Sequence, residues 1–415
     1  MNPATGILNK RIAPALSALS ENTYLSAIRT GMVSVVPLTI IGGVFMIVAY
    51  FPSARWEKFI APHLQLLQVP VTATFGLLAV FVCFAIGYDL GKRLKQEAIV
   101  SASIATLIFL MLQIQLKDLT LSMDGLGSKG LFTAIIIAMV SVRVQKFFTD
   151  KGVVIKLPEN VPAVVYESFL CLVPLFFLVL IFWLIRFVLG VDINNLVQAT
   201  LKPLVFALNT MPGILLYAFL VTILWSVGIN GDNAMDALVA PIFLQYLAAN
   251  VEATTAGQPL PYITANGFFT TFVNVGGTGA TIALALIMLN SKEPGFRKIS
   301  RISLPTQIFQ INEPIFFGFP IVLNPIFMIP YILNALILTA ITYLLMHWNV
   351  INKPFVNVPW TTPPLIGHYL VTGGDWKAAV WGVVSIAIAM MIYFPFAKAA
   401  ERQRLKAEAT GTAHE

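Results

Sequence analysis

Charged side chains are scarce in this sequence. Only 11% of its 415 residues are Asp, Glu, Lys or Arg, while 58% are hydrophobic. Soluble domains average about 25% charged residues, because a folded surface in water must be wetted. The deficit argues against a soluble protein, including a large apolar helical one. The hydrocarbon interior of a bilayer is itself apolar, so the composition predicts an integral membrane protein.

Redox and metal-binding patterns are also lacking. The only two cysteines, Cys83 and Cys171, lie in apolar stretches, so we interpret them as small hydrophobic residues rather than redox groups. The sequence has no metal-ligand spacing and no Ser/His/Asp set, so we expect neither a metal nor a cofactor. The first 25 residues include Lys10 and Arg11 and have no continuous apolar region, so we expect no cleavable signal peptide.

Long apolar stretches recur along the chain, and a helix needs about 20 such residues to cross a bilayer. The good candidates are 30–50, 70–90, 97–115, 130–147, 168–190, 211–229, 268–290, 325–346 and 376–396. A weaker candidate, 234–250, contains Asp236, Pro241 and Gln245, so it cannot face lipid on all sides. The pattern predicts an all-α membrane protein with about ten transmembrane helices.

The basic residues support this topology. They account for a net charge of +7 and cluster between alternate apolar stretches, which is a membrane-topology signal rather than a sign of nucleic-acid binding. The clusters are Lys10, Arg11 and Arg29; Lys92, Arg93 and Lys95; Arg143, Lys146, Lys151 and Lys156; Lys292, Arg297, Lys298 and Arg301; and Lys398, Arg402, Arg404 and Lys406. The positive-inside rule places these clusters, and both termini, in the cytoplasm. Omitting 234–250 would place the fourth cluster outside, so the rule supports that weak span.

Two proline-rich stretches, 303–324 and 356–374, are apolar enough for membrane depth but cannot be simple spans. Irregular backbone at that depth is tolerated only when it is buried in protein or lines a wet cavity. We therefore interpret both as re-entrant hairpins, the first entering from the cytoplasm and the second from outside. Opposed hairpins that meet near the midplane form the substrate site in several transporters.

The chain ends are polar. Residues 5–27 resemble an amphipathic helix on the cytoplasmic membrane surface, and a short soluble helix on the protein's own loops is an equal alternative. The C-terminal residues from Ala400 onward suggest a solvated helix end followed by disorder, which makes 401–415 a cytoplasmic tail.

Glu313 lies in the sequence Gln-Ile-Asn-Glu-Pro of the first hairpin. We expect it to be buried, and a carboxylate in a non-polar setting is costly unless it is partnered. Such a group can accept two hydroxyl hydrogen bonds or take a hydroxyl proton as a base, and Asn312 beside it is a further candidate contact. The alternative is a structural carboxylate that holds the hairpin through backbone N–H groups.

Two other polar segments interrupt apolar sequence. In Gly-Ile-Asn-Gly-Asp-Asn, 228–233, the glycines let the backbone leave a helix beside Asn230, and Asp232 and Asn233 suit hydroxyl-rich ligands. The alternative there is a plain helix C-cap and turn. In 273–281, Val-Asn-Val-Gly-Gly-Thr-Gly-Ala-Thr, we interpret the small residues as allowing close helix packing within a span. This segment lacks the Lys and the strand of a nucleotide loop.

Trp360 offers an aromatic face in the second hairpin, beside Thr361. Aromatic faces stack on the C–H faces of sugar rings. The alternative interpretation is a tryptophan of the interfacial belt.

Taken together, these motifs resemble the membrane-embedded IIC component of bacterial phosphoenolpyruvate-dependent sugar phosphotransferase systems, in the lactose, N,N′-diacetylchitobiose and cellobiose family. The matching segments follow the family's order and extend over nearly the whole chain: 155–169, 228–231, 276–281, 305–332 and 358–364. The segment around Glu313 is highly specific, whereas Gly-Gly-Thr-Gly-Ala-Thr alone would be weak.

The resemblance implies a sugar permease of the bacterial plasma membrane, with one membrane-embedded transport domain, 1–400. A substrate-binding part, roughly 200–400, would carry an external β-linked disaccharide past a scaffold and dimerisation part, roughly 28–190. A separate phospho-IIB protein, supplied through IIA, would then phosphorylate the sugar 6-hydroxyl from its own cysteine, and this leaves open whether the IIC chain is itself an enzyme. A homodimer in contact with membrane lipid is also implied.

The resemblance also assigns residues. Glu313 matches the glutamate beside the phosphorylated hydroxyl, Trp360 matches the sugar-stacking tryptophan, and Glu167 or Ser168 falls where a polar side chain often contacts the sugar. Asn230 departs from the pattern, because many relatives have histidine there. Asparagine keeps a donor and an acceptor but cannot relay a proton. Either Glu313 alone accepts the hydroxyl proton, or the preferred sugar differs from that of the relatives, or phosphotransfer is lost.

Two functions of other classes compete with this one. An ion-coupled secondary sugar transporter would use Glu313 as the coupling carboxylate and leave the sugar unmodified. A membrane sensor would bind sugar without transport, and the absence of any sizeable soluble domain argues against it.

Overall fold

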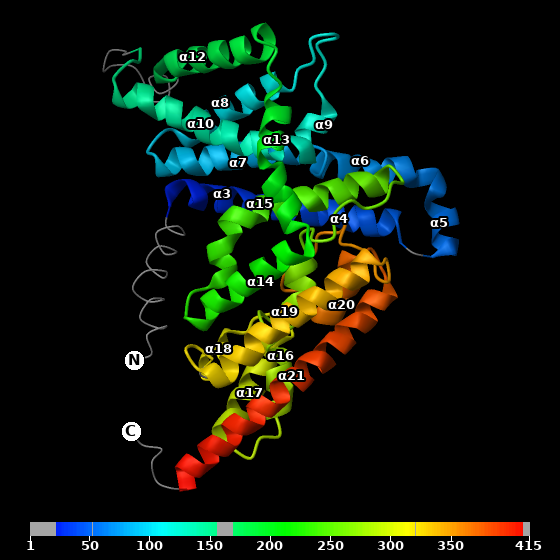
Figure 1. The fold of residues 1–415 in the computed structure, drawn as a ribbon. Helices are drawn as coiled ribbons and strands as arrows, with labels where there is room; N and C mark the ends of the chain where they lie inside the picture. The colour runs from blue at the N-terminus through cyan, green and yellow to red at the C-terminus, as the bar shows by residue number, and fades with distance from the viewer. Residues whose placement is uncertain (1–21, 52, 156–168, 320, 410–415) are drawn as a thin grey trace.

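The computed structural model describes residues 22–51, 53–155, 169–319 and 321–409. Within these ranges the regular secondary structure is helical, as the sequence predicts. Figure 1 shows α3 to α13 in the upper part of the molecule and α14 and α16 to α21 in the lower part, with α15 between them at the level of α3 and α4. The all-α fold is therefore confirmed.

The upper part contains the N-terminal helices. They are α3 (Thr23–Ser34), α4 (Val36–Ala49), α5 (Ala54–Ile60), η2 (Ala61–His63), α6 (Leu64–Thr74), α7 (Leu78–Arg93), α8 (Ala98–Leu112), α9 (Met123–Leu126), η3 (Ser128–Gly130), α10 (Leu131–Asp150), α12 (Leu172–Trp183) and the π-helical turn η4 (Leu184–Val188).

The remaining helices follow along the chain. They are α13 (Ile193–Leu208), α14 (Met211–Ser226), α15 (Gly231–Thr255), the π-helical turn η5 (Phe268–Val273), α16 (Ile282–Met288), α17 (Pro294–Gln307), α18 (Glu313–Gly318), α19 (Pro325–His347), α20 (Pro364–Val371) and α21 (Trp376–Ala409).

Helices occupy all ten predicted ranges, although 268–290 is helical only at its two ends. Among the described residues, five helices are long and apolar enough to cross a membrane, or six if a pair bent by 85° (Leu172–Val188 with Ile193–Leu208) is one span. α15 is not among them, but its 25 residues would extend about 37 Å at 1.5 Å per residue. The count of ten crossings stays a prediction.

Two helices differ from the prediction. α13 occupies a range in which the apolar pattern predicts no span, and Asp192 caps it by accepting from the Asn195 backbone N–H. At the N-terminus, α3 begins at Thr23 with Asn22 as its cap, so the predicted break at residue 27 falls inside a helix. The rest of the predicted amphipathic segment, residues 1–21, lies outside the described residues.

The C-terminal end of α21 is not simply solvated, so that expectation is wrong for its first residues. Glu401 is only 5% exposed. Its carboxylate accepts hydrogen bonds from the Ser291 hydroxyl and the Lys292 backbone N–H, both at 2.6 Å, and from Lys398 Nζ at 2.7 Å. The turn between α16 and α17 therefore holds this end of α21 in place, and the residues beyond 409 lie outside the described chain.

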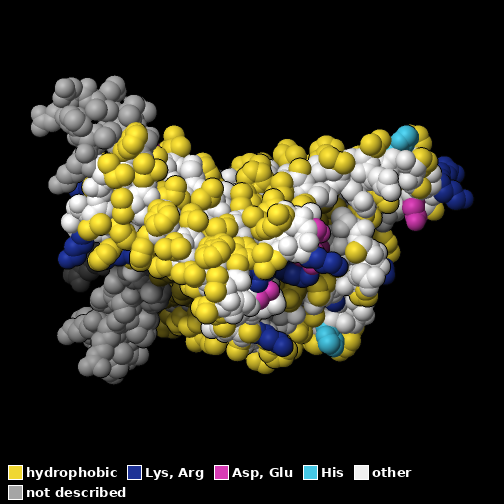
Figure 2. All heavy atoms as spheres, turned by 90° about the horizontal axis from the view of Figure 1, so that it is seen from above, with side chains coloured by type: hydrophobic (Ala, Val, Ile, Leu, Met, Phe, Trp, Pro, Cys, Tyr) yellow, Lys and Arg dark blue, Asp and Glu magenta, His cyan; other side chains and the backbone are white. Residues whose placement is uncertain are grey.

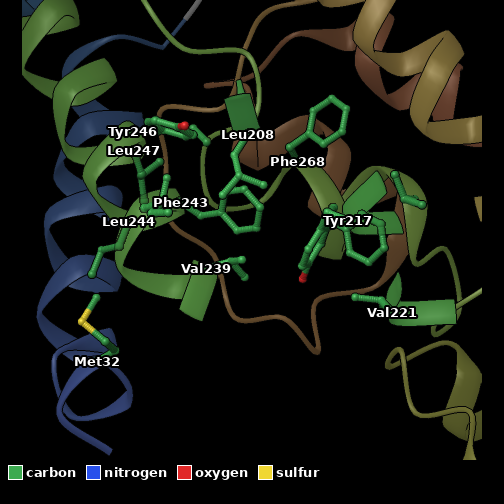
Figure 3. Packing of buried hydrophobic residues seen from close by; sticks show 14 of the residues in the cluster. Met32, Leu208, Tyr217, Val221, Val239, Phe243, Leu244, Tyr246, Leu247 and Phe268 are labelled. Atoms are coloured by element: carbon green, nitrogen blue, oxygen red, sulfur yellow. The ribbon is translucent and has the colours of Figure 1, made fainter. Parts of the chain in front are cut away.

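Apolar side chains join the upper and lower parts. In Figure 3, Met32 of α3 points toward Leu244 on one side of α15, while Phe243 of the same helix packs with Tyr217 of α14. The Tyr217 and Phe243 rings lie 5.2 Å apart in an edge-to-face arrangement, which is a favoured aromatic geometry. This core holds α14 and α15, and with them the segment 228–230 that connects the two helices.

The outer surface fits a lipid environment. Figure 2 shows hydrophobic side chains over most of the visible face, with Lys and Arg in a few separate groups. Large apolar side chains such as Phe176 of α12, Phe206 of α13 and Met391 of α21 are more than two-thirds exposed. A soluble monomer rarely exposes apolar patches of this extent, so the surface supports the predicted membrane location.

Candidate functional site

A glycine-rich loop, residues 274–281, interrupts the predicted span 268–290. Gly276, Gly277 and Gly279 have φ of +72°, +104° and +76°, a left-handed conformation that glycine adopts without a steric cost. A Cβ at Gly277 would lie 2.3 Å from Asn312 Cβ, and a Cβ at Gly279 would lie 2.3 Å from the Tyr331 ring. The prediction of a continuous span was wrong, because these backbone angles end the helix, while the predicted close packing by small residues is observed.

Three amide side chains of the first hairpin bond to this glycine-rich loop. Gln307 Nε2 donates to Thr281 Oγ1 at 3.0 Å, and Asn312 Nδ2 donates to the Thr278 carbonyl oxygen at 3.0 Å. Between them, Gln310 Oε1 accepts from the backbone N–H groups of Gly276 at 2.7 Å and Gly277 at 3.2 Å. The two segments are therefore joined by polar contacts along the whole turn between α17 and α18.

The first hairpin also meets the second. Gln310 Nε2 donates to the Thr362 carbonyl oxygen at 3.5 Å. α20 begins at Pro364, a position where proline costs no helical hydrogen bond, and its His368 ring packs edge-to-face on Phe272 of η5 at 4.6 Å. The structure thus brings the two predicted hairpins together beside the glycine-rich loop.

The segment 228–233 connects the end of α14 to the start of α15. Asn230 is the N-cap of α15, and its Oδ1 accepts from the Asn233 backbone N–H at 3.0 Å. The alternative of a plain C-cap is therefore incomplete, because the same residues also start the next helix. The cap uses only the Oδ1 atom of Asn230, and no residue in the described part of the chain accepts from its Nδ2 group.

Asp232 ties this segment to the glycine-rich loop. Its Oδ2 accepts from Trp225 Nε1 at 2.8 Å and from Thr278 Oγ1 at 2.6 Å, and its Oδ1 accepts from Asn274 Nδ2 at 3.3 Å. A carboxylate offers about four acceptor positions. Asp232 therefore positions the loop and keeps room for about one further donor.

The two residues expected to do most of the chemistry are not buried by protein. Glu313 is exposed, so the expectation of a buried carboxylate was wrong, and within the described chain it forms no ion pair. Trp360 is 60% exposed. Glu313 follows Gln310 by three positions and Trp360 precedes Thr362 by two, so the bond between Gln310 and the Thr362 carbonyl brings the chain segments that carry them together.

The remaining predicted residues differ in placement. Asn312 is buried and bonded to the loop, Thr361 is half-buried and Asn233 is exposed. Glu167 and Ser168 lie outside the described residues.

Two junction residues, Gln310 and Thr278, were not among our predicted site residues. A sequence signal could have identified Gln310: three amide side chains, at 307, 310 and 312, lie close together in otherwise apolar sequence. In the described residues, no group of three or more His, Cys, Asp or Glu could hold a metal ion.

The chain matches a protein-family model, "Phosphotransferase system, EIIC", over residues 29–335. It is similar to the lichenan permease IIC component of Bacillus subtilis, with 33% identity over 98% of this chain and 96% of the relative. It is also similar to the cellobiose-specific EIIC component of Geobacillus stearothermophilus, with 34% identity over 97% and 95% of the two chains. The lactose-specific EIICB component of Streptococcus mutans is 31% identical over 96% of this chain and 72% of its own.

A solved structure agrees with these relatives. The crystal structure of the transporter ChbC, the IIC component from the N,N′-diacetylchitobiose-specific phosphotransferase system, aligns with a TM-score of 0.90 at 34% identity. That alignment covers 98% of this chain and 100% of ChbC. The resemblance found in the sequence motifs therefore extends over the whole fold, and the chain belongs to the phosphotransferase system EIIC family of membrane sugar transporters.

Proposed function

We propose that the chain binds a β-linked disaccharide outside a bacterial cell and carries it across the plasma membrane for phosphorylation at its 6-hydroxyl. The observation that carries this proposal is the junction of three segments at Gln310, next to an exposed carboxylate and an exposed indole ring. The relatives are named for lichenan, cellobiose and lactose, and the ChbC structure for N,N′-diacetylchitobiose. A cellobiose-like sugar fits all of these names best.

Glu313 and Trp360 contact different parts of the sugar. The indole face stacks on the C–H face of a sugar ring, which removes apolar area of both from water. The carboxylate accepts hydrogen bonds from hydroxyl groups, and its exposure leaves its oxygens open to them. Asn312 and Thr361 lie next to these two residues in the chain and contribute polar contacts.

The start of α15 contributes the other side of the proposed site. Asn230 offers its Nδ2 donor and Asp232 its remaining acceptor position, while Asn233 lies at the exposed edge. We assign Glu167 or Ser168 to a further sugar contact on the strength of the family resemblance.

The chemical step is a phosphoryl transfer from a cysteine of a separate phospho-IIB protein, which is supplied through IIA. The S–P bond breaks, a P–O bond forms to the sugar 6-oxygen, and the hydroxyl proton passes to the Glu313 carboxylate. Asn230 stands where many relatives have histidine and cannot take that proton. Glu313 therefore serves as the general base.

The predicted topology is compatible with a phosphorylated IIB partner in the cytoplasm. Both termini and the basic clusters face the cytoplasm, where the phosphorylated partner is located. The chain works as a homodimer in lipid, with residues of roughly 28–190 as the scaffold and roughly 200–400 as the moving part.

The test combines binding and phosphorylation in the purified chain. We expect the wild-type protein to bind cellobiose and, with phospho-IIB, to yield cellobiose 6-phosphate. Glu313→Gln keeps one acceptor and loses the base, so the phosphorylation rate should fall by about 100-fold or more. Glu57→Gln changes an exposed carboxylate on α5 and is the matched control.

Two results would contradict the proposal. The first is no binding of cellobiose, lactose or diacetylchitobiose, together with uptake that is unchanged in Glu313→Gln. The second is uptake into vesicles that needs no phosphorylated partner and collapses with an uncoupler, which would support the ion-coupled alternative.

A further inference from the structure

Gln310 occupies a backbone position that normally belongs to glycine. The Gln310 N–H bonds to the Gln307 carbonyl oxygen at 3.0 Å, and the Ile311 N–H bonds to the Thr306 carbonyl oxygen at 3.1 Å. This pair of bonds is the Schellman arrangement that ends a helix, and its left-handed residue is usually glycine. Gln310 takes this place with φ of +68°, although a side chain is strained there.

The side chain of Gln310 has a use that compensates for this strain. The residue is only 7% exposed, and its amide bonds to two different segments. Oε1 accepts from Gly276 and Gly277, while Nε2 reaches the Thr362 carbonyl. Two successive backbone N–H groups that converge on one acceptor form a nest, a feature that usually binds an anion or a carbonyl group.

The neighbouring amides differ from Gln310 in what they join. The bonds of Gln307 and Asn312 both end on the glycine-rich loop, at Thr281 and Thr278. These bonds fix the first hairpin to the loop without involving the second hairpin. Of these three amides, Gln310 is therefore the one that joins the first hairpin to the second.

We infer that Gln310 is a positioning residue that sets the separation between the Glu313 side of the site and the Trp360 side. This inference rests on the proposed function, because it treats these two residues as sugar contacts. Gln310 itself touches backbone groups and acts through the two hairpins. With the amide in place, both contacts are held at a fixed spacing before the sugar arrives, which lowers the entropic cost of binding.

The decisive variant is Gln310→Gly. Glycine relieves the left-handed backbone, so the helix end should be as stable as in the wild type or more stable. It also deletes every side-chain bond of Gln310. A residue that served only to end the helix would lose nothing in this variant, whereas a positioning residue would lose its function while the fold is kept.

The first measurement needs no sugar. Hydrogen–deuterium exchange of the peptide covering 273–281 is followed in the purified full-length chain. In Gln310→Gly the amides of Gly276 and Gly277 should exchange about tenfold faster than in wild type, since a lost bond of 1.4 kcal/mol is a factor of ten. Gln310→Glu keeps an acceptor for both N–H groups and should exchange at nearly the wild-type rate. Unchanged exchange in Gln310→Gly, or equally fast exchange in Gln310→Glu, would overturn the inference.

The second measurement is equilibrium binding of cellobiose. Affinity should fall about tenfold in both Gln310→Gly and Gln310→Glu, because neither variant can donate to the Thr362 carbonyl. The matched control Gln307→Met leaves the link to Thr362 in place and should bind more tightly than either variant. Wild-type affinity in Gln310→Gly would refute the positioning role. If the wild-type chain binds no sugar, the proposed function fails, and the exchange measurement still decides whether Gln310 holds the junction.

Discussion

Asp232 should be one of the most sensitive positions for the stability of this chain. Its carboxylate accepts from Trp225 at 2.8 Å, Thr278 at 2.6 Å and Asn274 at 3.3 Å. All three donors belong to buried residues. Replacing Asp232 with alanine removes the acceptor and leaves these donors without a partner inside the protein.

The expected loss follows from the geometry. A hydrogen bond to a charged group contributes about 1.5–3 kcal/mol, and a buried donor left unpaired costs a similar amount. The two short bonds dominate, because the third is long and Asp232 itself is only half-buried. We expect Asp232→Ala to lower the free energy of unfolding by about 3–5 kcal/mol. Asp232→Asn keeps one acceptor and should lose about 1–3 kcal/mol.

Unfolding by SDS in mixed micelles, followed by circular dichroism without sugar, measures this difference. Asp118→Ala is the matched control, because that carboxylate bonds only to nearby Thr120 in an exposed loop. The control should stay within about 0.5 kcal/mol of wild type. An Asp232→Ala protein as stable as the control would refute the assignment of Asp232 as the link between α15 and the glycine-rich loop.

Three further predictions concern the site and its support. Gly277→Ala should lower the free energy of unfolding by about 2–5 kcal/mol in the same assay, because the new Cβ would lie 2.3 Å from Asn312 Cβ at φ of +104°. Its control, Gly152→Ala, has φ of +68° in open space and should lose about 1–2 kcal/mol. Equal losses in the two variants would contradict the packing argument. Glu401→Ala should destabilise the end of α21 by about 2–4 kcal/mol, since its buried acceptor is lost, and trypsin should then cleave the basic residues after it faster; an unchanged cleavage rate would show that this contact does not hold the helix. Asn230→His should change the order of sugar affinities and lower the free energy of unfolding by only about 1 kcal/mol, because the side-chain cap of α15 is lost while the introduced imidazole can relay a proton. Competition binding with cellobiose and lactose checks this, and an unchanged order would remove Asn230 from sugar choice.

Much of the candidate site was indicated by local sequence. Prolines and polar side chains in apolar surroundings marked 303–324 and 356–374 as irregular, and the carboxylate of Glu313 marked a candidate functional position. Clustered glycines marked 276–279 as unusual, but their apolar neighbours led to the prediction of a continuous span. The amide side chains that bond to this loop come from positions about 34 residues away in the chain, so no local pattern could reveal these contacts.

Long-range partners explain what the sequence did not predict. Gln310 bonds to Gly276 across 34 positions and to Thr362 across 52 positions. Glu401 bonds to Ser291 across 110 positions, so a charged tail end became a buried contact. Glu313 was expected to be buried because its neighbours are apolar, yet the turn that carries it directs it outward.

Composition and local pattern alone indicated a helical membrane protein, most of its helices and two of its irregular segments, but not α13 or the glycine-rich loop 274–281. Those properties follow from composition, helix length and the position of prolines, and each of them acts within one segment. Long-range packing decided that three distant segments meet at one glutamine, that Asp232 holds a loop, and that Glu313 and Trp360 are exposed. Hydrogen-bond partners far apart in the chain are selected by packing, which the order of residues encodes only through the complete fold.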